Sequence, residues 1–113
     1  MKTRIGRIFY FDAAHHICDY KGDCERVHGH TYKLEVVISG PVKKDGMVMD
    51  FKNLKEEVQS VLDKLDHHDL NRILDNPTAE HIVEFIWNSL EKKIPLYSIR
   101  VWEGEGKWAE KTG

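Results

Sequence analysis

The sequence predicts an α+β domain in which a four-stranded antiparallel sheet carries two helices on one face. Period-two alternation of apolar and polar residues marks two stretches near the start of the chain and two near its end. Between them lie two stretches with apolar residues at helical spacing. The order strand, strand, helix, helix, strand, strand puts both helices on the same face. The other face is then uncovered, and a domain this small would usually cover it by self-association.

Length and composition indicate one soluble globular domain over residues 1–113, with 41% hydrophobic residues, 32% charged residues and a net charge of −2. A strongly basic run with interleaved aromatics, which nucleic-acid binding would favour, is missing from the sequence. The sequence also has no long apolar stretch and no signal-peptide pattern, so we expect a cytoplasmic protein without a membrane partner. In that compartment we expect its two cysteines, Cys18 and Cys24, to be free thiols.

The first two strands carry histidines at the ends that face each other. Residues 3–15 alternate so that one face ends in His15, and residues 28–39 open with His28 and His30 on one face. Taken alone, His15 fits a core histidine at a strand end. If the strands pair antiparallel across the polar loop 16–27, the end of one lies beside the start of the next. The pairing therefore predicts that the three imidazoles meet.

The helical stretches begin with capping signals. Asp50 precedes a one-sided apolar pattern over residues 51–65, and Asn76-Pro77-Thr78 precedes a second pattern over residues 79–90. Between them, Asp66-His67-His68-Asp69 has two interpretations. It is either a helix end stabilised by histidines near the negative dipole, or an Asp66–His67 couple for proton transfer.

The last strands complete the sheet. Residues 97–102 alternate, with Tyr97, Ile99 and Val101 expected on one face, and a short strand begins near residue 107. Glu103 closes the third strand. It is either a buried anchor or an exposed acid beside a turn, and its local sequence slightly favours the exposed acid.

Three histidines without a fourth protein ligand are typical of a catalytic zinc, which keeps one position open. Cys24 as a fourth ligand would instead make a structural zinc, the main rival interpretation. Beside an open zinc, the Cys24 thiol could remove a proton and Asp66–His67 could handle a second one. This combination suits proton transfer and elimination next to a hydroxyl or carbonyl group.

Together these motifs resemble the 6-pyruvoyl-tetrahydropterin synthase / 6-carboxytetrahydropterin synthase family along nearly the whole chain. The resemblance rests on five motifs: Phe11-Asp12-Ala13-Ala14-His15, Cys24-x-x-x-His28-Gly29-His30, Leu65-Asp66-His67-His68, Asn76-Pro77-Thr78-Ala79-Glu80, and Glu103 after the third strand. It implies the tunnelling fold (T-fold), in which sheets from three subunits form a barrel and two trimers stack into a hexamer. The sites then lie between subunits.

The resemblance also implies site roles. The zinc ligands would be His15, His28 and His30, the proton-abstracting thiol Cys24, and the proton relay Asp66 and His67. Glu103 would grip the pterin ring in bidentate fashion and join the relay, and Thr78 would contact the substrate. Two residues depart from the family pattern. His16 follows His15 and could compete as a ligand, and Glu105 in Gly104-Glu105-Gly106 could substitute for Glu103.

The implied substrate is 7,8-dihydroneopterin triphosphate, and two products are open. The compact chain favours 6-carboxytetrahydropterin, formed with acetaldehyde and triphosphate on the route to queuosine and related deazapurines. The alternative product is 6-pyruvoyl-tetrahydropterin. A hypothesis of another class is a non-catalytic, zinc-stabilised module that binds a pterin or a partner.

Overall fold

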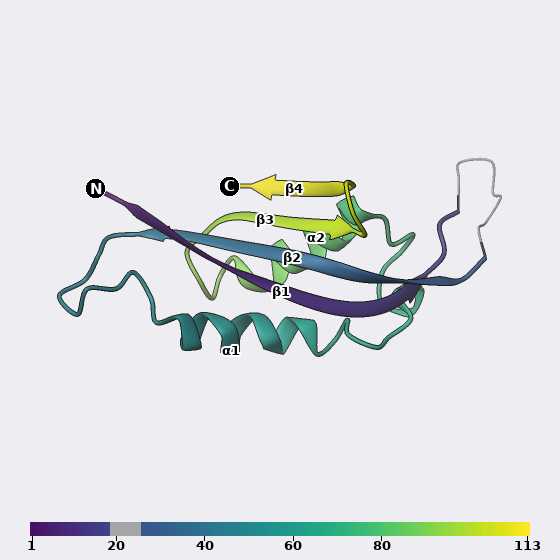
Figure 1. Ribbon diagram of the computed structural model, residues 1–113, viewed down its shortest axis with the longest axis horizontal. Coiled ribbons are helices and arrows are strands. Elements are labelled where there is room, and N and C mark those ends of the chain that lie inside the picture. The colour runs from purple at the N-terminus through teal and green to yellow at the C-terminus, as the bar shows by residue number, and fades with distance from the viewer. Residues whose placement is uncertain (19–25) are drawn as a thin grey trace.

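The computed structural model describes residues 1–18 and 26–113, and Figure 1 shows their arrangement. The elements, in chain order, are β1 (Thr3–His15), β2 (His28–Gly40), α1 (Phe51–Leu62), the 3-10 turn η1 (Leu70–Arg72), α2 (Ala79–Leu90), β3 (Leu96–Glu103) and β4 (Trp108–Thr112). The predicted order and element types are confirmed. None of the helices in the described part of the chain is long and apolar enough to cross a membrane.

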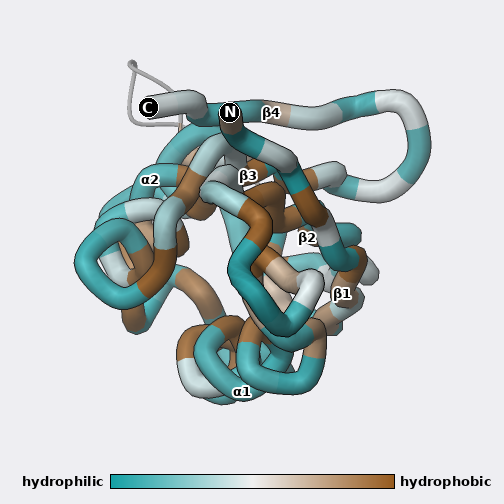
Figure 2. The backbone as a smooth tube through the Cα atoms, turned by 90° about the vertical axis from the view of Figure 1, so that its left-hand side faces the viewer, coloured by the Kyte–Doolittle hydropathy of each residue, from teal (hydrophilic) through white to brown (hydrophobic). Residues whose placement is uncertain are grey.

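The four strands form one antiparallel sheet in the order β1-β2-β3-β4. The β1–β2 pair is continuous along both strands, from Thr3 opposite Gly40 to His15 opposite His28. Seen along the strands, both helices lie on the same side of the sheet (Figure 2). The predicted two-layer architecture is therefore confirmed, and its long β1–β2 hairpin carries the histidine-bearing ends beyond the helices (Figure 1).

Side-chain caps set where the helices begin. The Asp50 carboxylate accepts a hydrogen bond from the Lys52 backbone N–H at 2.8 Å, and the Thr78 hydroxyl accepts one from the His81 N–H at 3.2 Å. The first helix ends at Leu62, three residues earlier than its apolar pattern predicts, and the chain continues in turns. These turns still bury Leu65, which explains why the pattern extended past the helix.

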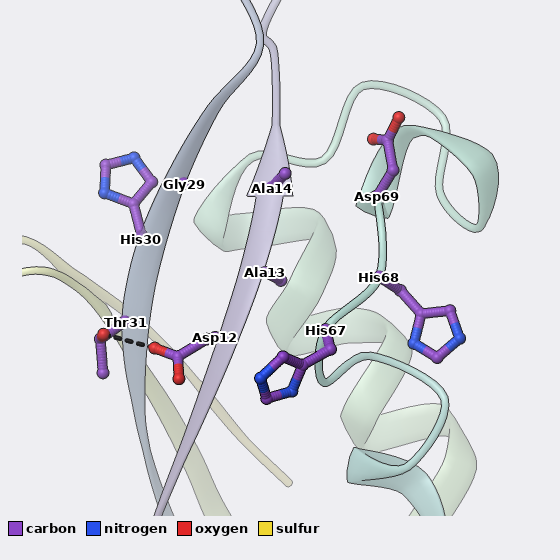
Figure 3. Close-up of a pocket in the computed structure, with 9 residues that line it drawn as sticks. All are labelled: Asp12, Ala13, Ala14, Gly29, His30, Thr31, His67, His68 and Asp69. Carbon is purple, nitrogen blue, oxygen red and sulfur yellow. Dashed lines mark hydrogen bonds between the residues drawn. The ribbon is translucent and has the colours of Figure 1, made fainter.

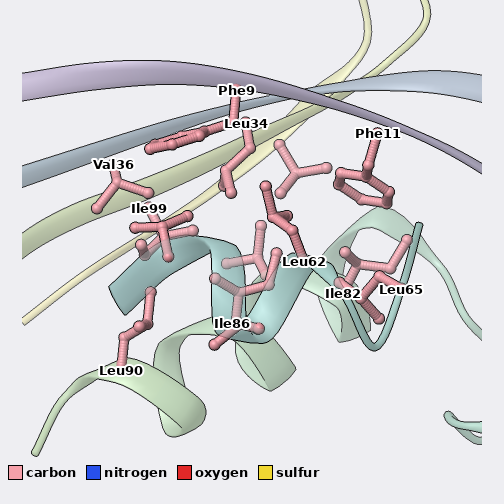
Figure 4. Packing of buried hydrophobic residues seen from close by; sticks show 14 of the residues in the cluster. Phe9, Phe11, Leu34, Val36, Leu62, Leu65, Ile82, Ile86, Leu90 and Ile99 are labelled. Atoms are coloured by element: carbon pink, nitrogen blue, oxygen red, sulfur yellow. The ribbon is translucent and has the colours of Figure 1, made fainter. Parts of the chain in front are cut away.

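The core lies between the sheet and the helices (Figure 4). Leu34, Val36 and Ile99 point from the strands toward Ile86 and Leu90 of α2, and all five side chains are fully buried. Burial of this kind contributes about 1.5–3 kcal/mol per large apolar side chain. The core thus holds β1 and β2 rigidly below their histidine-bearing ends.

The alternation expected for β3 is wrong at Tyr97. The register shifts between Val37 and Ile38 of β2, where an irregularity interrupts the pairing with β3. Tyr97 is consequently exposed, whereas Ser98 is buried. On the exposed face of the sheet the Arg4 guanidinium lies 4.3 Å from the centre of the Tyr97 ring.

This exposed face has no covering layer within the described chain. Ile8 and Tyr10 of β1 and Trp108 of β4 are among its exposed apolar side chains. The Arg100 guanidinium stacks 4.2 Å from the centre of the Trp108 ring and donates to the Glu110 carboxylate at 3.1 Å. The face therefore combines aromatic rings with paired charges.

Candidate active site

His15, His28 and His30 form a compact group at the end of the β1–β2 pair. His15 lies opposite His28, and His30 lies opposite Ala13, one step further along the ladder. The ring centroids are 4.7 Å apart for His15–His28, 4.9 Å for His15–His30 and 4.7 Å for His28–His30. One nitrogen from each ring lies within 4.8 Å of the others. The convergence predicted from antiparallel pairing is confirmed.

Hydrogen bonds determine which ring nitrogens face the centre of this group. His15 Nδ1 lies 2.9 Å from the Pro77 carbonyl oxygen, and His28 Nδ1 lies 2.9 Å from the Arg26 carbonyl oxygen. A carbonyl oxygen can only accept, so each Nδ1 carries the proton and donates it. The Nε2 atoms of these two rings then keep their lone pairs, which is the tautomer that a metal ion requires.

Two of the Nε2 atoms are buried without a hydrogen-bond partner among the described residues, those of His15 and His30. Buried polar atoms usually have a partner, so an exception needs an explanation. Desolvation lowers the pKa of His30, and the neighbouring His15 and His28 lower it further, although Glu103 opposes them. A buried imidazole nitrogen that keeps its lone pair is a suitable ligand for a divalent cation.

Glu103 lies beside the three histidines. Its Oε1 atom is 3.3 Å from His30 Nε2 and 3.9 Å from His15 Nε2, and its side chain is 21% exposed. The register of β2 and β3 places Glu103 opposite Tyr32, and this pairing turns the carboxylate toward the triad. The exposed-acid interpretation, slightly favoured by the local sequence, is therefore wrong, because the carboxylate is only partly exposed and lies beside the triad. The Lys107 Nζ atom lies 4.0 Å from the same Oε1 atom.

Asp66 and His67 lie on the free edge of β1. The Asp12 backbone N–H donates to Asp66 Oδ1 at 2.9 Å, and the Asp12 carbonyl accepts from the His67 N–H at 2.6 Å. A parallel bridge between Ala14 and Asp69 continues this contact. The segment thus pairs with β1 like a short extra strand, which the sequence pattern did not predict.

The Asp66 carboxylate contacts the His67 ring, with 3.1 Å between Oδ1 and Nδ1. The Asp12 hydrogen bond and then this contact lower the Asp66 pKa. His67 has a φ of 60°, a left-handed conformation that is costly for a residue with a side chain. The couple is therefore formed, which favours the proton-transfer interpretation over a simple helix end.

The ligand atoms of the Asp66–His67 couple and those of the triad form two separate groups. Asp12 and Thr31, a hydrogen-bonded cross-strand pair, lie on the exposed face because neighbouring positions on a strand alternate between faces. The ligand atoms of Asp12, Asp66 and His67 lie within 4.8 Å of one another. In Figure 3 the β1–β2 pair runs between the rings of His30 and His67.

A pocket of about 540 Å³ opens at the Asp66–His67 segment (Figure 3). Its lining comprises Asp12, Ala13, Ala14, Gly29, His30, Thr31, His67, His68 and Asp69. Small residues at the ends of β1 and β2 leave room for it between the strands and the segment. The pocket therefore borders both histidine groups, because His30 of the triad and His67 of the Asp66–His67 couple line it together.

The other predicted site residues have mixed outcomes. Cys24 lies outside the described residues. Cys18 is disulfide-bonded, so the expectation of free thiols is wrong for this residue. Thr78 follows Pro77, the residue whose carbonyl holds His15, and its hydroxyl caps α2. Glu105 is exposed in the turn and makes none of the contacts that Glu103 makes with the triad.

His16 does not join the triad. Its backbone N–H donates to the Asn71 side-chain oxygen at 2.8 Å, and its carbonyl accepts from the Asn71 amide at 3.0 Å. The same amide nitrogen lies 3.3 Å from His16 Nε2. Asn71 thereby holds the chain just after His15.

Sequence reasoning missed two contributors to the site. The Tyr32 hydroxyl lies 3.1 Å from His15 Nδ1, and the Asp12 backbone holds the Asp66–His67 couple. Tyr32 could have been found, because it is two residues after His30 and shares its face of β2. Asp12 acts through its backbone, which leaves no signal in the residue type.

The comparisons with known proteins agree with this architecture. The family model described as 6-pyruvoyl tetrahydropterin synthase matches residues 4–113. The chain is 49% identical over 107 residues to the "Putative 6-carboxy-5,6,7,8-tetrahydropterin synthase" of Archaeoglobus fulgidus, covering 94% of this chain and 92% of the relative. It is 45% identical over 108 residues to the "Dihydroneopterin monophosphate aldolase" of Pyrococcus furiosus, covering 92% of each chain.

A third relative, the 6-carboxy-5,6,7,8-tetrahydropterin synthase of Haemophilus influenzae, is 36% identical over 136 residues, covering 95% of this chain and 96% of the relative. Among solved structures, the 6-pyruvoyl tetrahydropterin synthase of Caenorhabditis elegans has the same fold, the T-fold, with a TM-score of 0.87. That match covers 100% of this chain and 96% of the other at 24% identity. The chain belongs to the 6-pyruvoyl tetrahydropterin synthase family.

Proposed function

We propose that this chain is a zinc-dependent carbon–oxygen lyase that converts 7,8-dihydroneopterin triphosphate and water to 6-carboxy-5,6,7,8-tetrahydropterin, acetaldehyde and triphosphate. Such an enzyme would supply queuosine and deazapurine biosynthesis in the cytoplasm. The observation that carries the proposal is the group of His15, His28 and His30, whose potential ligand atoms lie within 4.8 Å of one another. The Nε2 atoms of His15 and His30 are buried without a hydrogen-bond partner in the described part of the chain. The names of the Archaeoglobus and Haemophilus relatives support the choice of product.

The donor set fits zinc. Three neutral imidazoles are a common protein ligand set for a catalytic zinc, which keeps a further position for water or substrate. Bound there, zinc would polarise a substrate oxygen as a Lewis acid. The carbonyl groups of Pro77 and Arg26 orient two of the rings from outside.

Proton transfer is assigned to Cys24 and to the Asp66–His67 couple. The Cys24 thiolate would remove a proton from the substrate side chain. Asp66 fixes the His67 tautomer through the 3.1 Å contact, and the exposed imidazole would carry the second proton. Because Cys18 is disulfide-bonded and the proposed base is a thiol, activity should be assayed under reducing conditions.

Substrate orientation is assigned to Glu103 and Thr78. A carboxylate at the position of Glu103 can accept two parallel N–H groups from the guanidine-like edge of a pterin. Its 3.3 Å distance from His30 Nε2 would place the ring beside the metal-binding group. Thr78 would contact the same ligand from the start of α2.

We further propose that two trimers of this chain stack into a homohexamer with sites between subunits. Two observations support it. The exposed sheet face carries Ile8, Tyr10 and Trp108, and the ligand atoms of Asp66–His67 form a group separate from those of the triad. A neighbouring copy could bring its own Asp66–His67 couple to the triad.

A second candidate function is a dihydroneopterin monophosphate aldolase, favoured by the 45% identity to the Pyrococcus furiosus protein of that name. It would break a carbon–carbon bond in the side chain of the monophosphate. The same triad could serve it, since an oxygen next to the broken bond must also be polarised. The family model's own description supports 6-pyruvoyl-tetrahydropterin as an alternative product.

Product identification tests these proposals. The reduced, zinc-loaded chain is incubated separately with dihydroneopterin triphosphate and dihydroneopterin monophosphate, and the products are identified by mass spectrometry. Acetaldehyde with 6-carboxytetrahydropterin supports the leading proposal. A 6-pyruvoyl product, or cleavage of the monophosphate alone, replaces it with the corresponding alternative. Binding of pterin without turnover of either substrate would leave only the non-catalytic module.

A further inference from the structure

The Tyr32 hydroxyl is buried directly behind the histidine triad. Tyr32 is fully buried on the inner face of β2, two residues after His30, and its ring stacks on Phe11 with centroids 4.9 Å apart. Its hydroxyl oxygen lies 3.1 Å from His15 Nδ1. The packing contact with Phe11 requires only an aromatic ring, so a phenylalanine would satisfy it.

The hydroxyl contacts a nitrogen whose protonation state is already determined. His15 Nδ1 donates to the Pro77 carbonyl at 2.9 Å, so the phenolic oxygen is a second acceptor for the same N–H group. Two acceptors on one side of the ring restrict its rotation more than one does. They also leave Nε2, the buried atom without a partner, as the lone-pair nitrogen.

The surroundings keep the phenol neutral. Burial raises the Tyr32 pKa, and the charge of Glu103 raises it further. Burying a hydroxyl costs free energy unless it is hydrogen-bonded, and His15 is its hydrogen-bond partner within the described chain. Packing therefore explains why an aromatic ring occupies this position, but it does not explain why the ring carries a hydroxyl group.

We propose that the Tyr32 hydroxyl is a positioning group for the metal site, fixing the tautomer and orientation of His15 together with the Pro77 carbonyl. This inference rests on the proposed function, because it requires a metal ion at the triad. Tyr32 acts through His15 and touches neither metal nor substrate. Loss of such an outer partner typically weakens metal binding by about 10–100-fold.

The test compares zinc affinity in wild type, Tyr32→Phe and the control Tyr97→Phe. Tyr97 is exposed on the other face of the sheet. Removing its hydroxyl group should therefore not affect the triad. Affinity is measured by chelator competition at one pH, and the visible spectrum of the cobalt-substituted proteins reports ligand geometry. Tyr32→Phe should bind zinc about 10–100-fold more weakly and shift the cobalt spectrum, whereas Tyr97→Phe should match wild type.

Two further measurements separate positioning from a general loss of structure. Melting of the metal-free proteins shows whether Tyr32→Phe keeps its fold. In zinc-loaded wild type, NMR should show a slowly exchanging His15 Nδ1–H proton close to the Tyr32 ring. Equal zinc affinity in Tyr32→Phe and wild type, or a metal bound through His15 Nδ1, overturns the inference alone. A wild type that takes no zinc overturns it together with the proposed zinc dependence.

Discussion

The imidazoles of His15 and His28 lie edge to face with centroids 4.7 Å apart, because the antiparallel register sets the two residues directly opposite each other. They come from the end of one strand and the start of the next, separated in sequence by the loop. The strand register alone is enough to bring the two rings together. The triad is therefore a property of the β1–β2 ladder.

Removing one triad imidazole should abolish stoichiometric zinc binding. We expect His28→Ala to weaken zinc binding by more than about 100-fold, since even an outer partner of a ligand contributes about 10–100-fold. His28 is only half-buried and lies outside the apolar core, so the metal-free fold should keep its stability within about 0.5 kcal/mol. Chelator competition and thermal melting measure the two quantities. The control is His68→Ala, which removes an exposed imidazole, and normal zinc binding by His28→Ala would contradict the assignment.

Neutralising Glu103 should impair substrate binding and leave zinc in place. Hydrogen bonds to a charged group contribute about 1.5–3 kcal/mol, so Glu103→Gln should lower kcat/KM by about 10–100-fold. Steady-state kinetics and metal analysis on the same preparation provide the test. Glu110→Gln, which removes a carboxylate paired with Arg100 on the exposed face, is the matched control. Zinc loss in Glu103→Gln would mean that the carboxylate is a metal ligand.

We expect His67 to contribute to turnover and not to folding stability. Its φ of 60° lies in the left-handed region, which asparagine also adopts readily. We expect His67→Asn to unfold at the same or higher denaturant concentration than wild type, while turnover falls by about 100–10,000-fold, as for loss of a general acid or base. Urea titration and single-turnover kinetics measure the two effects. Parallel loss of stability and activity would favour a structural role.

The Asp66 carboxylate should make the free energy of unfolding depend on pH in the acidic range. Its pKa in the folded chain is lowered from 3.8, mainly by the Asp12 N–H. The resulting stabilisation is fully present above pH 3.8 and is lost as pH falls through the lower folded pKa. The free energy of unfolding of wild type minus that of Asp66→Ala should therefore shrink as pH falls below about 4. A difference that does not change with pH would show that the carboxylate charge contributes nothing.

The exposed sheet face should be a contact between copies of the chain. Wild type should elute with about six times the 13.2 kDa mass of one chain, measured by light scattering. Trp108→Glu, placed on the edge strand, should shift the mass toward smaller species and lower activity with it. A fully active monomer would contradict sites shared between subunits.

Most of the fold could be predicted because its strands and helices have strong periodicity. The triad could be predicted from the same periodicity, since antiparallel pairing alone brings His15 to His28. Glu103 was expected at the site only through the family resemblance, because its orientation depends on the β2–β3 register, which no local pattern specifies. Tyr97 was assigned to the wrong face because a register irregularity between Val37 and Ile38 is invisible in alternation.

The position of Asp66–His67 along the edge of β1 also could not be predicted from the sequence. It arises from backbone hydrogen bonds to Asp12 and from a parallel bridge to Ala14, and backbone contacts between distant segments are not encoded by residue type. The local signal identified the couple as a candidate for proton transfer. It could not show that the ligand atoms of the couple form a group separate from those of the triad.

X-ray absorption at the zinc edge of the loaded, reduced protein tests the central claim most directly. We expect three imidazole nitrogens at about 2.0–2.1 Å from the zinc and one oxygen that substrate or solvent can replace. A sulfur neighbour at about 2.3 Å that persists with substrate bound would contradict it, because a thiolate would then occupy the position required for catalysis.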